Sequence, residues 1–317
     1  MRTPQRRCAI APVLTVTAPL FVLVALGYLL ARFGGWHGAL SDALTRFVFN
    51  VAVPALLFQL MSDFSSQPRV DPWLLVAYFG GTFLIYAAGI LIGRRRFALD
   101  GAAASVLGMG GVFGNTVLLG IPLAQVALGE GALPAVSMVI VFHSLALWTL
   151  VTVSVEWARH RTPSMAGLTR TARDVALNPI VASILMGTAF GFTGLGMPAI
   201  PDRTLDLLSG AAAPLSLVAL GMSMQQFGIR EGWRASLWMT ATKLALMPLV
   251  VYALARALDL SPIETQAITM LAALPIGANV YLMAKAFGTF EGPVSSAIVL
   301  STALSAATTP LVIALTR

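Results

Sequence analysis

Long apolar runs separated by short polar gaps form the dominant pattern of the chain. Most runs are about 20 residues long, the length that a helix needs to cross a bilayer core of roughly 30 Å. The connections are short and carry helix breakers, such as Gly34-Gly35 and Ser261-Pro262. The pattern predicts an all-α polytopic membrane protein with ten transmembrane helices, over residues 10–32, 42–62, 72–93, 102–127, 132–155, 176–195, 205–226, 233–257, 264–287 and 293–315.

Composition supports lipid as the main solvent. Hydrophobic residues make up 57% of the chain and charged residues 10%, whereas about 25% of an ordinary soluble domain is charged. The formal charge of +7 would suit a nucleic-acid-binding protein. However, the basic residues lie in gaps between apolar runs and are not interleaved with aromatic residues, so we interpret them as orientation signals. The single cysteine, Cys8, excludes an internal disulfide and a cysteine metal cluster.

The distribution of arginine and lysine predicts the orientation. The loops after helices 1, 3, 5, 7 and 9 hold Arg32, Arg46, Arg94, Arg95, Arg96, Arg159, Arg161, Arg170, Arg173, Arg230, Arg234 and Lys285. The other side holds Arg69, Arg203, Arg256, Arg317 and the N-terminal Arg2, Arg6 and Arg7. The excess predicts odd-numbered loops in the cytoplasm and both termini on the periplasmic side of a bacterial inner membrane. The N-terminal arginines favour the opposite orientation. The first helix is expected to be retained, because no small-x-small cleavage site closes its apolar run.

One long polar link, over residues 156–175, divides the chain into two predicted repeats of five helices, residues 10–155 and 176–317. Repeats with an odd number of helices run in opposite directions, which is the arithmetic of an inverted-topology repeat. Irregularities match between the halves: Pro54 in helix 2 corresponds to Pro214 in helix 7. Helices 4 and 9 each carry a polar interruption. Gly/Pro breaks at corresponding places in two halves indicate a binding site.

The interruptions in helices 4 and 9 predict a site for an anion. Gly114 in helix 4 permits backbone torsions that other residues resist, and Pro275 in helix 9 removes a backbone donor. Both segments are expected to unwind and to cross near the middle of the membrane. Unwinding exposes half-helix N-termini, whose free N–H groups attract anions. Asn115 and Asn279 add amides there, so that the two segments form a cradle for a carboxylate.

Each of these residues also has a simpler explanation. Glycine in membrane helices often serves close packing, and proline kinks are common. The paired occurrence in corresponding helices favours the site. The run from Gly108 to Gly114 is not a nucleotide loop, because no strand precedes it and no Lys-Ser/Thr follows.

Several motifs resemble the auxin efflux carrier family, which includes plant PIN-formed auxin exporters and bacterial malonate or malate permease-like proteins. The similar stretches are Gly114-Asn115-Thr116 with Gly120-Ile121-Pro122-Leu123, Ala273 to Gly277 with Asn279, Arg46-Phe47-Val48 to Pro54, Asn178-Pro179, and Ala219-Leu220-Gly221. Gly114 departs from the family pattern, since plant members carry proline there, and the long central loop of the plant proteins is absent. The resemblance implies ten helices, a scaffold bundle, a transport bundle with a crossover of helices 4 and 9 near the substrate, and a homodimer.

Other polar residues are placed within the membrane by the pattern. Lys243, in the middle of helix 8, is expected to support the crossover electrostatically or to attract the anion, because ionisable groups at that depth are usually functional. Pro54 and Pro122 are expected to support the same region. Asn50 and Gln59 in helix 2 either reach the site or bond between helices. The predicted substrate-binding residues are Gly114, Asn115, Thr116, Pro275, Gly277, Asn279, Asn50 and Gln59.

The leading hypothesis is a secondary transporter that moves small mono- or dicarboxylates by alternating access, with no metal, cofactor or nucleic acid. A sodium-coupled symporter of the bile-acid type would show acidic sodium ligands beside the crossover, and the sequence offers none there. A channel stays an alternative that turnover kinetics would separate. An intramembrane enzyme would need paired aspartates, an active serine with histidine, or His-Glu-x-x-His. His37, His143 and His160 form no such motif; His143 alone could relay protons or satisfy one hydrogen bond.

Overall fold

The computed structural model describes residues 5–36, 38–62, 70–160, 179–225, 227 and 232–316. Within these ranges every regular element is helical, and the one β-type pairing is an isolated antiparallel bridge between Gly114 and Ile276. Each of the ten predicted apolar segments contains helix. Predictions that lie outside the described residues are those on Arg2, His37, Arg69, the linker from residue 161 to 175, Asn178, Arg230 and Arg317.

Six helices are long and apolar enough to cross a membrane, in the part of the chain that the structure describes. They are Ala39–Gln59, Trp73–Arg96, Glu130–Arg159, Ala199–Ser223, Trp233–Ala257 and Glu291–Thr316. Shorter apolar helices cover Ala18–Phe33, Gly101–Gly110, Thr116–Ala127 and Pro179–Phe192. Two of these, Gly101–Gly110 and Thr116–Ala127, are the two parts of the predicted fourth helix, so its interruption shortens both.

The chain forms two compact units, each built from separate stretches of sequence. Unit 1 comprises Met1–Asp71, Val117–Val141 and Ala176–Gln226, and unit 2 comprises Pro72–Thr116, Phe142–Val175 and Phe227–Arg317. Each unit therefore draws residues from both predicted five-helix repeats. The two compact units are therefore not the two predicted repeats, and the inverted repeat stays a prediction.

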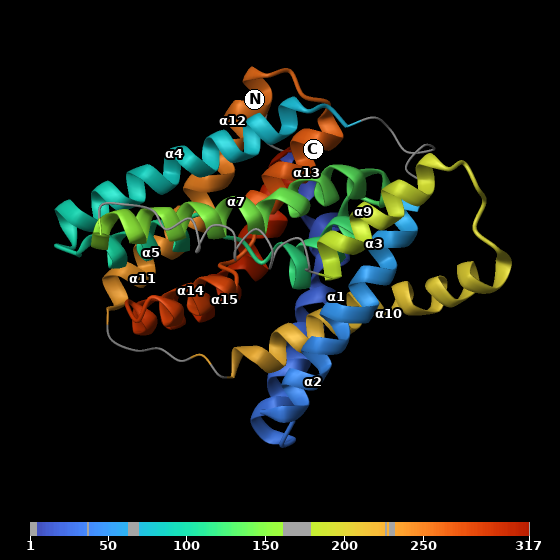
Figure 1. Ribbon diagram of the computed structural model, residues 1–317, viewed down its shortest axis with the longest axis horizontal. Helices are drawn as coiled ribbons and strands as arrows, with labels where there is room; N and C mark the ends of the chain where they lie inside the picture. The colour runs from blue at the N-terminus through green and yellow to red at the C-terminus, as the bar shows by residue number, and fades with distance from the viewer. Residues whose placement is uncertain are drawn as a thin grey trace. The chain divides into compact units, whose positions relative to one another are not determined.

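Unit 1 is held together by close helix pairs. Its helices are α1 (Gln5–Phe33), α2 (Ala39–Phe47), α3 (Val53–Ser62), α6 (Ile121–Ala127), α9 (Pro179–Phe192) and α10 (Ala199–Met224). Helix α1 packs along α10, and α3 packs along α9 (Figure 1). A Cβ atom on Gly27 would lie 2.1 Å from the carbonyl oxygen of Val218, and one on Gly221 would lie 1.9 Å from that of Val24. These glycines allow the backbones of α1 and α10 to touch, as small residues do in membrane helices.

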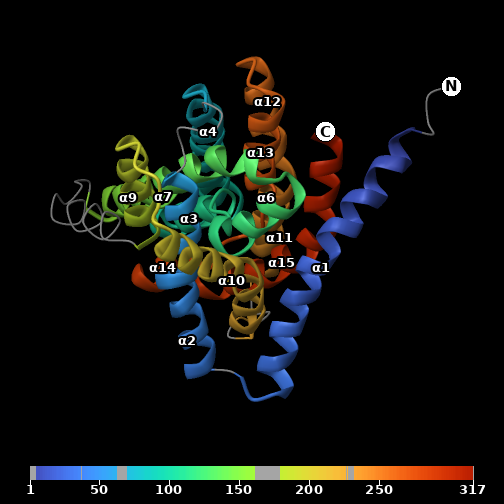
Figure 2. The same cartoon turned by 90° about the vertical axis from the view of Figure 1, so that its right-hand side faces the viewer.

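Unit 2 contains the two interrupted helices and their supports. Its helices are α4 (Trp73–Arg96), α5 (Gly101–Gly110), α11 (Trp233–Ala241), α12 (Met247–Ala257), α13 (Pro262–Ala272), α14 (Asn279–Ala286) and α15 (Glu291–Thr316). Helix α7 (Leu133–His160) begins in unit 1 and ends in unit 2. Helix α12 packs on α4 and α13, while α15 packs on α11, α13 and α14 (Figure 2). A Cβ atom on Gly89 of α4 would lie 2.6 Å from the Cα of Gly108, so α4 and α5 also meet through glycine.

Three π-helical segments interrupt the regular helices within the described residues: η1 (Val48–Ala52), η3 (Thr116–Gly120) and η5 (Thr242–Leu246). Each segment ends two residues before a proline, namely Pro54, Pro122 and Pro248. A proline ring clashes with the carbonyl four residues earlier and provides no N–H for it, and a widened π turn makes room for the ring. Pro54 and Pro122 therefore shape the helices just before them.

Candidate functional site

The two helix interruptions contact each other inside unit 2. Helix α5 ends at Gly110 and η3 begins at Thr116, while α13 ends at Ala272 and α14 begins at Asn279. We call residues 111–115 and 273–278 the paired breaks. The N–H of Asn115 donates to the carbonyl of Pro275 at 2.9 Å, and the N–H of Gly277 donates to that of Phe113 at 3.0 Å. The pairing satisfies backbone groups that would otherwise be costly in apolar surroundings.

Glycine provides space in the paired breaks. We expected Gly114 to supply unusual torsions, but its φ is not among the positive values of the described glycines. Instead, a Cβ atom on Gly114 would lie 3.2 Å from Cε of Lys243 and 3.3 Å from the carbonyl oxygen of Leu271. A Cβ atom on Gly277 would lie 3.0 Å from the carbonyl oxygen of Gly114. The reason for glycine at both positions is the close approach of two backbones and a lysine.

Basic and hydroxyl side chains compensate the C-terminal ends of the second interrupted helix. Lys243 is fully buried on η5, and its ammonium donates to the carbonyl of Ala272, the last residue of α13. The hydroxyl of Thr309 donates to the next carbonyl, that of Ala273, at 3.0 Å. At the far end of α14, the Arg159 guanidinium donates to the carbonyl of Phe287. Cations suit these ends, because the last carbonyls of a helix carry partial negative charge.

The N-terminal ends differ from one another. Ser261 and Glu264 form a capping box at the start of α13, and Asp100 caps α5 by accepting from the N–H of Ala103 at 2.8 Å. Helix α14 has no side-chain cap. Among the described residues, no hydrogen bond engages the N–H groups of Ala278 and Asn279. The start of α14, at the end of the second break, therefore presents partial positive charge and donors that have no partner among the described residues.

The two predicted asparagines adjoin these donors with unused amides. Asn115 is 9% exposed in the first break, and Asn279 is half-buried at the start of α14. Neither side-chain amide forms a hydrogen bond within the described part of the chain. Thr116 is buried beside Asn115, and its N–H donates to the carbonyl of Gly114 at 2.9 Å. Thus the structure gathers most of the predicted site: Gly114, Asn115, Thr116, Pro275, Gly277, Asn279 and Lys243.

The remaining predicted residues belong to unit 1. Gln59 donates its amide to Asp206 at 2.6 Å and accepts from the hydroxyl of Ser209 at 3.0 Å, so it joins α3 to α10. Asn50 is exposed on η1. Pro54 lies in α3 and Pro122 in α6. Gln59 therefore adopts the interhelical role that the sequence left open.

His143 on α7 borders the first break. Its ring packs edge-to-face on Phe113 with centroids 4.6 Å apart, and the Tyr78 hydroxyl lies 3.4 Å from its Nδ1. Its Nε2 has no hydrogen-bond partner among the described residues. Lys243 lies close enough to interact with the ring electrostatically.

Sequence reasoning missed the supports that α15 supplies. The hydroxyl of Ser301 accepts from the N–H of Ile276 at 3.1 Å, and Thr309 binds the end of α13. With Ser305 they are fully buried. A spacing of four residues places Ser301, Ser305 and Thr309 on one helix face. That polar stripe in an apolar helix was the available signal.

Comparison with known proteins gives matches over nearly the whole chain. The sequence profile of a family described as membrane transport protein matches residues 12–313. A Rhizobium meliloti (strain 1021) protein named "Putative malonate transporter" is 30% identical, over 94% of both chains. Auxin efflux carrier component 8 of Arabidopsis thaliana is 22% identical, over 94% of this chain and 95% of that protein. An uncharacterized transporter of Methanothermobacter thermautotrophicus is 27% identical, over 92% of this chain and 94% of that protein.

Proposed function

Because the chain belongs to the membrane transport protein family, we propose that it is a secondary carrier of small organic anions. The resemblance to auxin efflux carriers is confirmed by the Arabidopsis relative, and another relative is named for malonate transport. Malonate and auxin are both carboxylates. The proposed substrate is a small mono- or dicarboxylate, moved by alternating access.

The proposed architecture has ten helices in two inverted repeats, with the fourth and ninth helices crossing near the middle of the membrane. Both termini lie on the periplasmic side of the inner membrane, as the arginine distribution predicts. Support for the crossing comes from the antiparallel bridge between Gly114 and Ile276, because it joins the interruptions of those two segments. Carriers built on inverted repeats bind substrate where such broken helices meet.

The observation that carries the proposal is the set of unused donors at the paired breaks. The N–H groups of Ala278 and Asn279 and the amides of Asn115 and Asn279 have no partner in the described part of the chain. A carboxylate accepts such hydrogen bonds, and the N-terminal end of α14 favours its negative charge.

Lys243 has a supporting role in this proposal. Its ammonium is already bound to the carbonyl of Ala272, so it offsets the negative end of α13 beside the site. The carboxylate therefore meets the positive end of α14 while the neighbouring negative end is neutralised. We propose that transport follows the substrate gradient or the membrane potential; a sodium requirement for uptake would rule out this uncoupled form.

Binding measurements test the proposed site directly. The purified full chain in detergent is titrated with malonate and with malonamide, which keeps the shape but lacks the charge. We expect malonate alone to bind, and Asn115→Ala and Asn279→Ala each to weaken it about tenfold, because each loses a hydrogen bond to a charged group.

The control is Gln266→Ala. It removes an amide that donates to the carbonyl of Thr316 at 3.2 Å, away from the paired breaks. Its affinity for malonate should equal that of the unmodified protein. Equal binding of malonamide, or unchanged affinity in both asparagine variants, would contradict the proposed site.

A further inference from the structure

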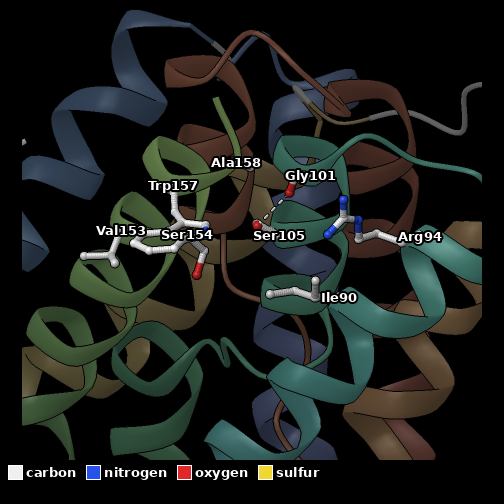
Figure 3. A pocket seen from close by; sticks show the side chains of 8 residues that line it. All are labelled: Ile90, Arg94, Gly101, Ser105, Val153, Ser154, Trp157 and Ala158. Carbon is white, nitrogen blue, oxygen red and sulfur yellow. Dashed lines mark hydrogen bonds between the residues drawn. The ribbon is translucent and has the colours of Figure 1, made fainter. Parts of the chain in front are cut away.

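A cavity of about 660 Å³ lies within unit 2 where α4, α5 and α7 meet (Figure 3). None of its lining residues belongs to the paired breaks. Small-molecule sites in proteins occupy roughly 300–1,000 Å³, so the cavity is large enough for a ligand. Gly101 lies at its edge, where a Cβ atom would come within 2.4 Å of the Cβ of Ala158, and so α5 begins in contact with α7.

One cation at this cavity has no ion-pair partner within the described part of the chain. The Arg94 guanidinium extends from α4 toward Ser105 on α5 (Figure 3). Arg94 is exposed and forms no ion pair with any described residue. A cation without an ion-pair partner at the wall of a cavity favours an anionic ligand.

The two serines add acceptors to the same cavity. Ser105 donates to the carbonyl of Gly101 at 2.8 Å, and Ser154 donates to that of Leu150 at 2.7 Å. Each hydroxyl lines the cavity and keeps lone pairs on its oxygen, which can accept from a ligand. The cavity thus combines a cation for an anion with acceptors for ligand hydroxyl groups.

The surroundings indicate a lipid. Arg94 lies in the last turn of α4, a helix long and apolar enough to cross a membrane, next to the exposed Arg95 and Arg96. Ile90 and Trp157 line the cavity, and Trp157 is 61% exposed. Tryptophan and arginine at the end of a membrane helix are typical of the lipid head-group region. Basic pockets between such helices bind anionic lipid head groups.

We propose that this cavity binds the head group of an anionic phospholipid of the glycerol type. Arg94 pairs with the phosphodiester. The head-group hydroxyls donate to Ser105 and Ser154, and the acyl chains leave along Ile90 and Trp157. Free phosphate lacks both the hydroxyl-bearing glycerol and the apolar part, so it fits fewer of these groups. The proposal does not depend on the substrate of the carrier.

Native mass spectrometry of the purified full chain tests this site. The protein in detergent is incubated with phosphatidylglycerol, with phosphatidylethanolamine, or with phosphatidylglycerol and excess inorganic phosphate. We expect retained phosphatidylglycerol to exceed phosphatidylethanolamine, and inorganic phosphate not to displace it. Arg94→Gln should lower the apparent affinity about tenfold, because a charge-assisted hydrogen bond is lost. Ser154→Ala should lower it about threefold through the loss of one acceptor.

Arg95→Gln is the matched control, since it removes the same charge from the same helix turn without lining the cavity. It should change affinity less than twofold. Equal losses for Arg94→Gln and Arg95→Gln would reduce the effect to general attraction by a basic surface and overturn the site. Displacement by inorganic phosphate would make it a site for a free anion. Ser154→Ala keeps the basic charges, so its unchanged affinity would also contradict the proposed pose.

Discussion

The two interruptions in unit 2 reach a similar geometry with different residues. The first break, residues 111–115, contains Gly111 and Gly114 but no proline, whereas the second, residues 273–278, contains Pro275 besides Gly277. At the first, the chain curls back on α5: the N–H of Gly111 donates to Gly108 at 3.1 Å, and that of Phe113 donates to Met109 at 2.9 Å. The carbonyls of Gly108 and Met109 near the end of α5 are therefore satisfied by backbone.

At the second break, side chains from other helices form the hydrogen bonds to the backbone. Pro275 has no N–H for the helical bond to Leu271, and the N–H of Ile276, four residues after Ala272, is bound to Ser301. The carbonyls of Ala272 and Ala273 receive Lys243 and Thr309 instead. The end of α5 is thus satisfied by local backbone bonds, whereas the carbonyls of Ala272 and Ala273 at the end of α13 depend on donors that other helices of the unit position.

Among the variants that test this difference between the two breaks, removal of the Lys243 donor should lower the free energy of unfolding the most. Lys243→Met keeps the volume but leaves the carbonyl of Ala272 unsatisfied in a buried place, so we expect a loss of about 3 kcal/mol in unfolding free energy. The thermal midpoint in detergent measures it. Lys285→Met, at an exposed lysine near the end of α14, should leave the midpoint nearly unchanged. Equal shifts in both would contradict the dependence of the proline break on Lys243.

A methyl group at Gly114 should have an intermediate effect. Gly114→Ala would place a Cβ 3.2 Å from Cε of Lys243, and we expect a cost of about 1–2 kcal/mol because the lysine or the backbone must shift. Gly131→Ala is the control, since nothing lies within 4 Å of its Cβ and its φ is not positive. The same thermal measurement in the double variant Gly114→Ala/Lys243→Met should reveal non-additive costs. Strict additivity would show that the two residues do not share this space.

Loss of the Thr309 hydroxyl should have the smallest effect. Thr309→Val removes the donor to Ala273 and should cost about 1 kcal/mol. The neighbouring Thr308 hydroxyl has no partner among the described residues, so Thr308→Val should cost nothing measurable. A comparison of the two thermal midpoints isolates the hydrogen bond from the change in shape. A larger loss for Thr308→Val would refute the assignment.

Much of the fold was predictable because a helix that crosses a membrane needs a long apolar run, which is easy to recognise in the sequence. The residue ranges of the helices follow the apolar runs, and the breaks lie at the predicted glycine, proline and asparagine positions. The π segments were not predicted, because a proline such as Pro248 can also kink a helix without one. Thr309 and Arg159 were not predicted as hydrogen-bond donors to the helix ends, because a single sequence does not show which distant helices meet.

For the candidate site, the positions of the breaks were predictable, whereas the packing around them was not. The sequence predicts Asn115 and Asn279 beside the breaks, and neither side-chain amide has a hydrogen-bond partner among the described residues. The sequence predicts a need for torsional freedom at Gly114, but in the structure glycine is required there because Lys243 leaves little room for a side chain. The space around a residue depends on the helix that packs against it, and the local sequence does not show which helix that is.

Counterflow of labelled malonate in liposomes most directly tests whether a carboxylate binds at the paired breaks. Malate and indole-acetate serve as further substrates, and Gln266→Ala serves as the folded control. We predict that the unmodified protein and Gln266→Ala accumulate labelled malonate. In Asn115→Ala and Asn279→Ala the initial rate of counterflow should fall about tenfold or more. Absence of exchange with all three acids, or full exchange in both asparagine variants, would contradict the proposed carboxylate site.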